Sequence, residues 1–114
     1  MFQRFGSEFM NQPNPSPEKI PVLIPKELSP LIPGYLDDRR QDVERMRAFL
    51  EQNDFATLKN LAHMIKGSGA SYGFEELSYL GEVLETAADN EPEKIKPTLE
   101  RMVRYLDNVE IEYV

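Results

Sequence analysis

Apolar residues recur at steps of three and four residues, or multiples of these, along most of the chain after Pro33. This spacing places them on one face of an α-helix, so it predicts amphipathic helices. We expect the first helix to run from Pro33 to just before Asn53, because proline suits a first helical turn and the acidic pair at 37–38 favours the positive helix start. Its apolar face consists of Leu36, Val43, Met46 and Leu50.

Three further segments have the same period. We predict helices over residues 55–72, from 74 to about 88, and from about 92 to 109. Pro97 is compatible with the last helix because it falls within about its first two turns. This last helix has the most regular apolar repeat, formed by Ile95, Leu99, Met102, Leu106 and Val109.

Local signals mark the ends of these helices. Asp54 can cap the start of the second helix, and Gly73 ends it. We expect Asp89-Asn90 to break the third helix. No segment alternates with a period of two over a useful length, so we expect no strands. Four amphipathic helices joined by short turns pack most simply as an antiparallel, up-down four-helix bundle, and the predicted fold class is therefore all-α.

The N-terminal part of the chain follows a different pattern. Residues 11–33 hold all but two of the nine prolines, so we interpret residues 10–32 as an extended Pro-rich N-terminal extension, in which a short helical turn can form over 25–31. Residues 1–9 contain Gly-Ser-Glu-Phe, which is typical of a cloning junction, and we interpret them as a remnant of one or as a natural terminus outside the fold. The bundle is assigned to residues 33–114.

Composition narrows the function classes. The chain has 114 residues, enough for one domain, and 20 Asp+Glu against 13 Lys+Arg give it a net charge of -7. This acidic balance argues against nucleic acid as a partner. No apolar run approaches the roughly 20 residues that span a bilayer, so we expect no membrane insertion. The absence of Cys fits a cytoplasmic location, and one His excludes sites built from several imidazoles. We expect no metal and no cofactor.

The single histidine, His63, falls on the polar side of the second helix. At about 100° per residue, the apolar side chains of this helix cluster at about 160–260° from His63. We therefore expect the imidazole to face solvent. Those apolar side chains are Leu58, Leu61, Ala62 and Ile65.

The neighbours of His63 on the same helix face are two lysines and two very small residues. Lys59, Lys66, Gly67 and Ala70 lie at i−4, i+3, i+4 and i+7. Glycine inside a helix costs about 1 kcal/mol relative to Ala, so its presence calls for a reason. Gly69 falls on the packed side, where tight contact with another helix is that reason. Gly67 lies beside a solvent-facing His, where close approach of another molecule fits better.

Neutral imidazole is a good nucleophile near physiological pH, and its attack on a phosphoryl group gives a phosphoramidate that can be passed on. A nearby Lys would attract the phosphoryl oxygens, and small neighbours would let a partner's carboxylate approach in line. His63, Lys66 and Gly67 meet these needs on one exposed helix face.

The chain resembles the histidine-containing phosphotransfer (HPt) domains of two-component phosphorelays. The family's pattern His-x-x-Lys-Gly-Ser is present as His63-Met64-Ile65-Lys66-Gly67-Ser68, followed by Gly73. Leu84-Glu85 is similar to the family's Leu-Glu pair in the following helix. Gly69 departs from the family's usual Ser or Ala but is also small. The resemblance extends from Pro33 to about Tyr113.

The resemblance implies that His63 is the phosphoacceptor, at Nε2, that Lys66 steadies the phosphoryl group, and that Gly67 leaves room for the partner. Helix geometry alone adds Lys59 as a second phosphoryl-stabilising residue and Ala70 as a second partner-approach residue. Glu85 is assigned a structural role. The implied partners are response-regulator receiver domains and a hybrid sensor histidine kinase. The protein would be a phosphoryl carrier rather than an enzyme, since no segment resembles a nucleotide-binding loop.

Other chemistry finds less support in the sequence. Ser68 and Ser71 could be nucleophiles, but no paired base is available and helix hydroxyls are usually structural. A di-metal site in a bundle needs Glu-x-x-His pairs, which are absent, so the acidic positions are better explained as a solvated face. These positions are Glu75, Glu76, Glu82 and Glu85. The alternative function is an interaction-only bundle with a silent His63, against which the lysine and glycine beside His63 argue.

Overall fold

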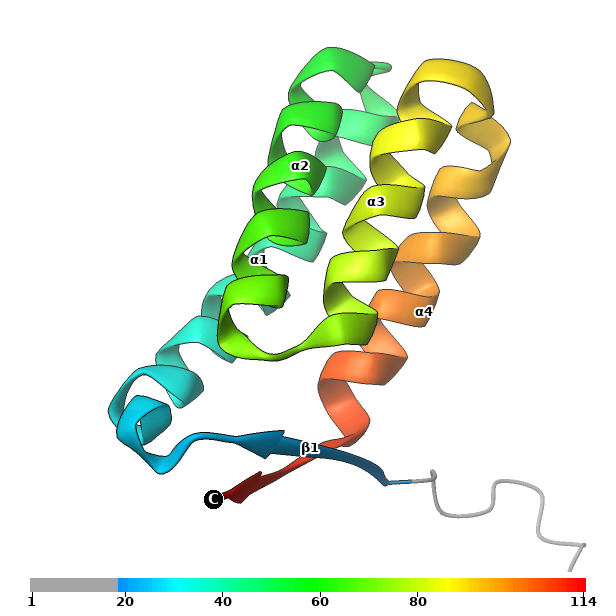
Figure 1. Ribbon diagram of the computed structural model, residues 1–114. Coiled ribbons are helices and arrows are strands. Elements are labelled where there is room, and N and C mark those ends of the chain that lie inside the picture. Colours follow the sequence, from blue (N-terminus) through cyan, green and yellow to red (C-terminus); the bar gives the residue numbers. More distant parts are fainter. Residues whose placement is uncertain (1–18) are drawn as a thin grey trace, which may run out of the picture.

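The computed structural model describes residues 19–114, and four helices make up most of this part of the chain (Figure 1). Successive helices run in opposite directions, and α1 packs beside α4 while α2 packs beside α3. The predicted up-down bundle is therefore confirmed. Predictions for residues 1–9, and for residues 10–18 of the Pro-rich extension, lie outside the described residues. The helices are α1 (Ile32–Glu51), α2 (Phe55–Tyr72), α3 (Glu75–Asn90) and α4 (Ile95–Asn108).

The two ends of α2 follow the predicted signals, but two other predicted signals are wrong. Asp89 and Asn90, expected to break the third helix, are the last two residues of α3. Asp37 and Asp38 lie beyond the first turn of α1. The Asp54 carboxylate accepts a hydrogen bond from the backbone N–H of Thr57 at 3.2 Å, which caps the start of α2. Gly73 ends α2 in the left-handed conformation, with φ of 95°. A 3-10 helix, η3 (Pro92–Lys94), precedes α4, and another, η2 (Lys26–Leu31), forms at the predicted helical turn.

The prediction of no strands is wrong. Strands β1 (Ile20–Ile24) and β2 (Val109–Tyr113) form a two-stranded parallel sheet in which Ile20 pairs with Val109. Val109, expected to close the apolar repeat of the last helix, begins β2 instead. β1 (IPVLI) does not alternate, whereas β2 (VEIEY) alternates apolar and acidic residues over all 5 positions, a short strand signal that the prediction missed. The pairing of the two strands joins opposite ends of the described chain. Such a pairing depends on tertiary contacts that no local pattern encodes.

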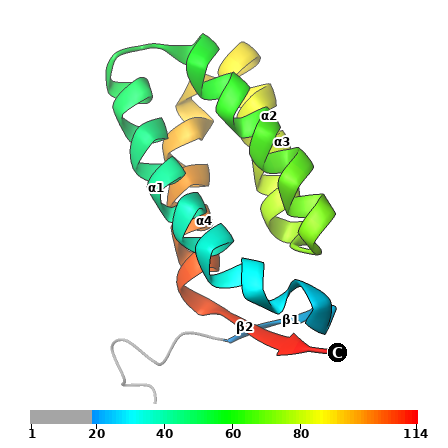
Figure 2. The same cartoon turned by 90° about the vertical axis from the view of Figure 1, so that its left-hand side faces the viewer.

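The sheet crosses one end of the bundle and covers its core (Figure 2). Ile24 is fully buried, and four strand residues pack on the core, so the packed unit begins upstream of the boundary expected at Pro33. Those four are Ile20, Val22, Val109 and Ile111. Val114 N–H donates to Ile24 O at 2.9 Å. The backbone N–H and C=O groups of the even-numbered residues of β1 therefore point toward β2, and those of the odd-numbered residues point away from it. Pro21 therefore lies where the sheet needs no N–H.

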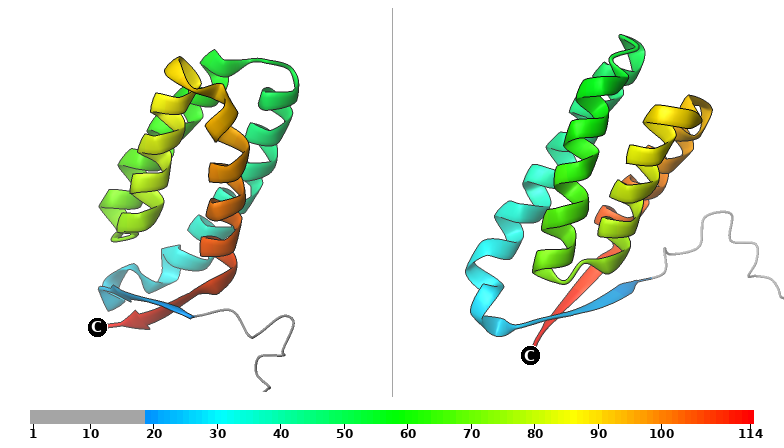
Figure 3. Two further views of the ribbon diagram at one scale, coloured as in Figure 1. Left: turned by 90° about the vertical axis from the view of Figure 1, so that its right-hand side faces the viewer. Right: turned by 45° about the horizontal axis from the view of Figure 1, so that its top comes forward.

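Close backbone contact between α2 and α3 is a main feature of the core (Figure 3). A β-carbon at Gly81 would lie 2.8 Å from the backbone N of Lys66 and 2.9 Å from the backbone O of Ala62. One at Gly69 would lie 3.0 Å from the backbone N of Ser78, which confirms that Gly69 serves helix packing. The backbone of α2 around His63 is thus held directly against α3.

Within the described residues, no helix is long and apolar enough to cross a membrane.

Candidate functional site

His63 lies near the middle of α2, and its side chain is 68% exposed. The apolar side chains Leu58, Ala62 and Ile65 of the same helix are buried in the core. The predicted orientation of the imidazole toward solvent is therefore confirmed, and a role for His63 in core packing is excluded.

The imidazole contacts one carboxylate of the neighbouring helix. His63 Nδ1 lies 2.9 Å from Glu85 Oε2 of α3, whose side chain is 23% exposed. A carboxylate can only accept, so in the neutral ring Nδ1 carries the proton and donates it to Glu85. Nε2 then bears the free lone pair. The Glu85 contact fixes the tautomer that a nucleophilic Nε2 requires.

The sequence pattern does not predict this contact, because it assigns Glu85 a structural role only. The signal was nonetheless present in the Leu84-Glu85 pair. Leu84 is fully buried in the core, and the next residue along α3 is rotated by about 100° from it, onto the flank of the helix. A glutamate at that flank can reach a histidine on the adjacent helix.

Two lysines flank this contact and also reach carboxylates of α3. Lys59 Nζ lies 2.6 Å from Asp89 Oδ2, and Lys66 Nζ lies 4.0 Å from Glu82 Oε2. The hydrogen bond and charge of Asp89 raise the pKa of Lys59 above its ordinary value. With the His63–Glu85 contact these pairs form three successive cross-helix contacts, which we call the α2–α3 ladder. Its residues are Lys59, His63 and Lys66 of α2, and Asp89, Glu85 and Glu82 of α3.

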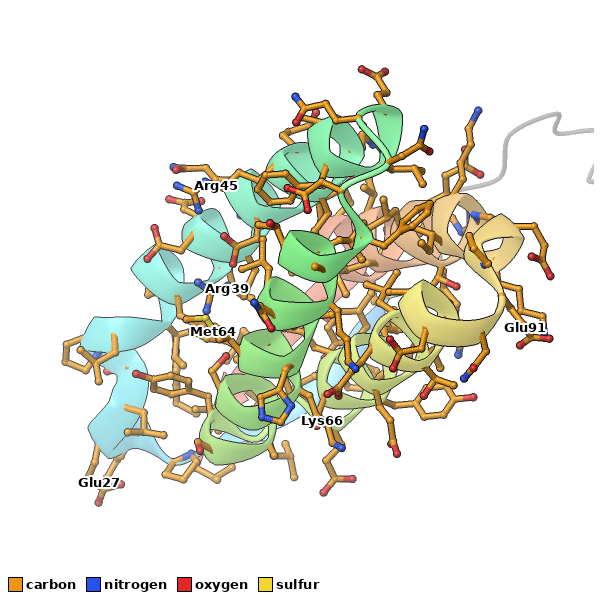
Figure 4. All side chains as sticks on the ribbon, turned by 90° about the horizontal axis from the view of Figure 1, so that it is seen from above. Glu27, Arg39, Arg45, Met64, Lys66 and Glu91 are labelled. Atoms are coloured by element: carbon orange, nitrogen blue, oxygen red, sulfur yellow. The ribbon has the colours of Figure 1, made fainter. Side chains whose placement is uncertain are left out.

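The two predicted phosphoryl-stabilising lysines therefore differ in how they are held. Lys59 is in a short ion pair, whereas the pair made by Lys66 is at the limit of contact. Both side chains are partly exposed, and Lys66 lies on the side of α2 that faces α3 (Figure 4). A rotation of the Lys66 side chain costs little, because exposed ion pairs contribute at most about 1 kcal/mol.

The surface next to His63 is open at both predicted partner-approach residues. Gly67 and Ala70 are exposed. Among residues 19–114, no heavy atom would lie within 4 Å of a β-carbon built at Gly67, apart from its chain neighbours and its own helix backbone. Packing within the described part of the chain therefore does not account for Gly67, in contrast to Gly69.

Ser68 faces the other neighbour of α2, helix α1. Its Oγ lies 2.8 Å from the hydroxyl of Tyr35 and accepts a weak hydrogen bond from Arg39 at 3.5 Å. Arg39 also contacts the buried carboxylate of Asp42 at 2.8 Å, and Arg45 donates to the same carboxylate at 2.7 Å. Ser68 thus belongs to a polar network between α1 and α2. Ser71 donates to Gly67 O at 3.1 Å, so neither serine is paired with a base.

A cavity of about 230 Å³ lies between α1 and α2, beside this network. Met64 lies at its rim, on the side of α2 toward Arg39 and Arg45 (Figure 4). The Met64 side chain is 67% exposed although it is apolar. Methionine is a flexible apolar side chain, and Met64 directly follows His63 in the sequence.

The acidic residues do not assemble into a metal site in the described part of the chain. Over residues 19–114, no group of three His, Asp or Glu side chains is arranged to hold a metal ion. Glu82 and Glu85 belong to the α2–α3 ladder, and Glu76 lies 3.5 Å from Arg101.

Comparison with known proteins identifies a family but no individual relative. The family model described as "Hpt domain" matches residues 31–110, which include α1 to α4 and every residue of the α2–α3 ladder. No curated protein and no solved structure matches the chain.

Proposed function

Because the chain belongs to the Hpt domain family, we propose that His63 is the residue that carries the phosphoryl group. Hpt domains take part in histidine phosphotransfer in phosphorelays, as phosphoryl carriers and not as kinases. In this proposal His63 accepts the group from a receiver-domain aspartate and passes it to another receiver domain. The observation that carries the assignment is the Nδ1 contact with Glu85 on a side chain that is 68% exposed.

The transfer step follows from this contact. The lone pair of His63 Nε2 forms a bond to phosphorus while the bond between phosphorus and the aspartyl oxygen breaks, and the aspartate leaves as a carboxylate. The ring gains positive charge, which the Glu85 carboxylate stabilises through the shared Nδ1 proton. In the next transfer the same proton makes the ring a better leaving group. Glu85 therefore acts as a positioning residue in both directions.

Lys66 and Lys59 would support the group as point charges. Lys66 is the stronger candidate, because its 4.0 Å contact with Glu82 leaves its ammonium free to turn toward a phosphoryl group on Nε2. Lys59 would first have to leave the 2.6 Å pair with Asp89. The open surface at Gly67 and Ala70 would admit the receiver domain, whose aspartate must come within bonding reach of Nε2.

The partners follow from the family. Hpt domains interact with receiver domains in phosphorelays. We propose that a hybrid sensor histidine kinase supplies the phosphoryl group and that a response regulator takes it up. These partners and the Cys-free composition are consistent with a cytoplasmic location, which we include in the proposal.

Substitution of His63 tests the assignment. A receiver domain phosphorylated with acetyl phosphate should label the wild-type chain, and the label should be acid-labile and base-stable, as expected for a phosphoramidate. His63→Gln should fold normally, since the side chain faces solvent, and should take no label. Ser71→Ala is the matched control, because it removes an exposed hydroxyl of the same helix and should retain the label. Undiminished labelling of His63→Gln would overturn the proposal.

A further inference from the structure

The α2–α3 ladder holds more negative than positive charge. Its two ammonium groups face three carboxylates, one of which contacts the imidazole. A phosphoryl group on His63 would add up to about two further negative charges. A site that retained such a group strongly would need an excess of cations, whereas here each lysine lies within 4.0 Å of a carboxylate of α3.

We propose that Glu82 and Asp89 bias the phosphoryl-transfer equilibrium of His63 toward release. This inference rests on the proposed function, and it assigns the two carboxylates a role that is separate from the transfer chemistry itself. They act in two ways. Asp89 holds Lys59, which would otherwise turn to the phosphoryl oxygens, and both carboxylates place a like charge near the group. Both effects raise the free energy of the phosphorylated state relative to the unphosphorylated state.

The contacts of the ladder are spaced closely enough for the charges of Glu82 and Asp89 to act on a phosphoryl group at His63. Lys59 and Lys66 lie one turn to either side of His63, so neighbouring contacts are about 5–6 Å apart at the β-carbons. This separation is shorter than the Debye length of about 10 Å at 0.1 M ionic strength, so salt does not fully screen the charges. A unit charge at about 7 Å in water changes an equilibrium constant by about twofold to threefold.

The two carboxylates should differ in their effect. Asp89 holds Lys59 in the shortest contact of the ladder, at 2.6 Å, and raises its pKa. Glu82 holds Lys66 only at 4.0 Å. Removal of the Asp89 charge therefore releases a lysine that is now strongly held, whereas removal of the Glu82 charge releases one that is already loose. We expect Asp89→Asn to shift the equilibrium more than Glu82→Gln.

The equilibrium constant itself is the readout. A receiver domain that labels the wild-type chain is phosphorylated, mixed with each variant, and left until the phosphoryl distribution between the two proteins is constant. Glu82→Gln/Asp89→Asn should move the distribution toward His63 by about fivefold at about 20 mM ionic strength, and by less at about 0.5 M. Glu110→Gln/Glu112→Gln is the matched control, because it removes the same two charges from exposed positions of β2 at the sheet end of the bundle.

The outcomes separate this inference from the function on which it rests. If the wild-type chain takes no label from any receiver domain, the proposed function fails. If it is labelled but the ladder variant distributes the phosphoryl group as the wild type does, the inference alone fails. An equal shift in the Glu110→Gln/Glu112→Gln control would also overturn it, since the effect would then reflect net charge and not the ladder. Melting curves followed by circular dichroism should coincide for all three proteins.

Discussion

Gly67 and Gly69 lie two residues apart in α2, yet their surroundings differ completely. A β-carbon at Gly69 would press on the backbone of α3, at 3.0 Å from Ser78 N. One at Gly67 would meet no atom of the described residues within 4 Å, beyond its own helix and chain neighbours. The glycine at 69 is therefore explained by a contact inside the molecule. Gly67 lowers the helix propensity of α2 but makes no such close contact, which fits a surface kept clear for another protein.

Two other residues of the motif lie on opposite flanks of α2. Ser68 points toward α1 and is bonded to Tyr35, while Lys66 points toward α3 and lies at the edge of the α2–α3 ladder. One short segment of α2 thus contributes to packing on both flanks and to an open face that carries His63. A substitution should affect either stability or phosphotransfer, according to the side on which it falls.

The largest effect on stability should come from a larger side chain in the close contact between α2 and α3. Ala at Gly81 would force its β-carbon against two backbone atoms of α2, at 2.8 and 2.9 Å, and a backbone cannot yield as a flexible side chain can. We expect Gly81→Ala to lower the free energy of unfolding by about 2 kcal/mol or more. The melting temperature should fall by about 10 °C.

Gly67→Ala is the matched control, because it makes the same change at an exposed position of α2, outside the close contact with α3. Ala is the better helix former by about 1 kcal/mol, so this variant should melt at a higher temperature than the wild type. Thermal unfolding followed by circular dichroism compares the two variants directly. If both alanines stabilise the protein, α2 and α3 are not in close backbone contact.

Most of the fold is predictable from the sequence, because each helix carries its own signals. The apolar period locates α1 to α4, and Asp54 and Gly73 mark the two ends of α2. The sheet is not predictable in this way. β1 does not alternate, and the alternation of β2 covers only 5 residues that begin at Val109, a residue that also fits the period of the last helix. The pairing of β1 with β2 depends on a contact between distant parts of the chain.

The site is predictable to the extent that it lies on one helix. The exposure of His63 and the open space at Gly67 follow from angles around α2, which depend only on positions in the sequence. The contacts with Glu85, Asp89 and Glu82 depend on how α2 and α3 are aligned along their lengths. Close packing at Gly69 and Gly81 fixes that alignment, and helix periodicity contains no information about it.

A smaller effect is expected at Lys66, which belongs to the open side. Lys66→Ala should leave the melting temperature nearly unchanged, because the 4.0 Å pair with Glu82 is exposed. Transfer from a phosphorylated receiver domain to His63 should slow by about fivefold at low salt, the equivalent of about 1 kcal/mol. Lys94→Ala is the control, since Lys94 forms a similar exposed pair with Glu91 outside the ladder. Equal rates for both variants at low salt would show that Lys66 serves only as a solvated charge.

The most direct test of the division between the two sides is Gly67→Gln. The long side chain would stand one turn beyond His63 on the same face, where the receiver domain must approach, and its β-carbon would have no heavy atom of residues 19–114 within 4 Å beyond its chain neighbours and its own helix backbone. Both the melting temperature and the rate of phosphotransfer from a receiver domain should be measured on the same sample. We predict an unchanged or higher melting temperature together with a sharp loss of transfer. Retention of both properties would contradict the account, because Gly67 would then not be reserved for the approach of a partner.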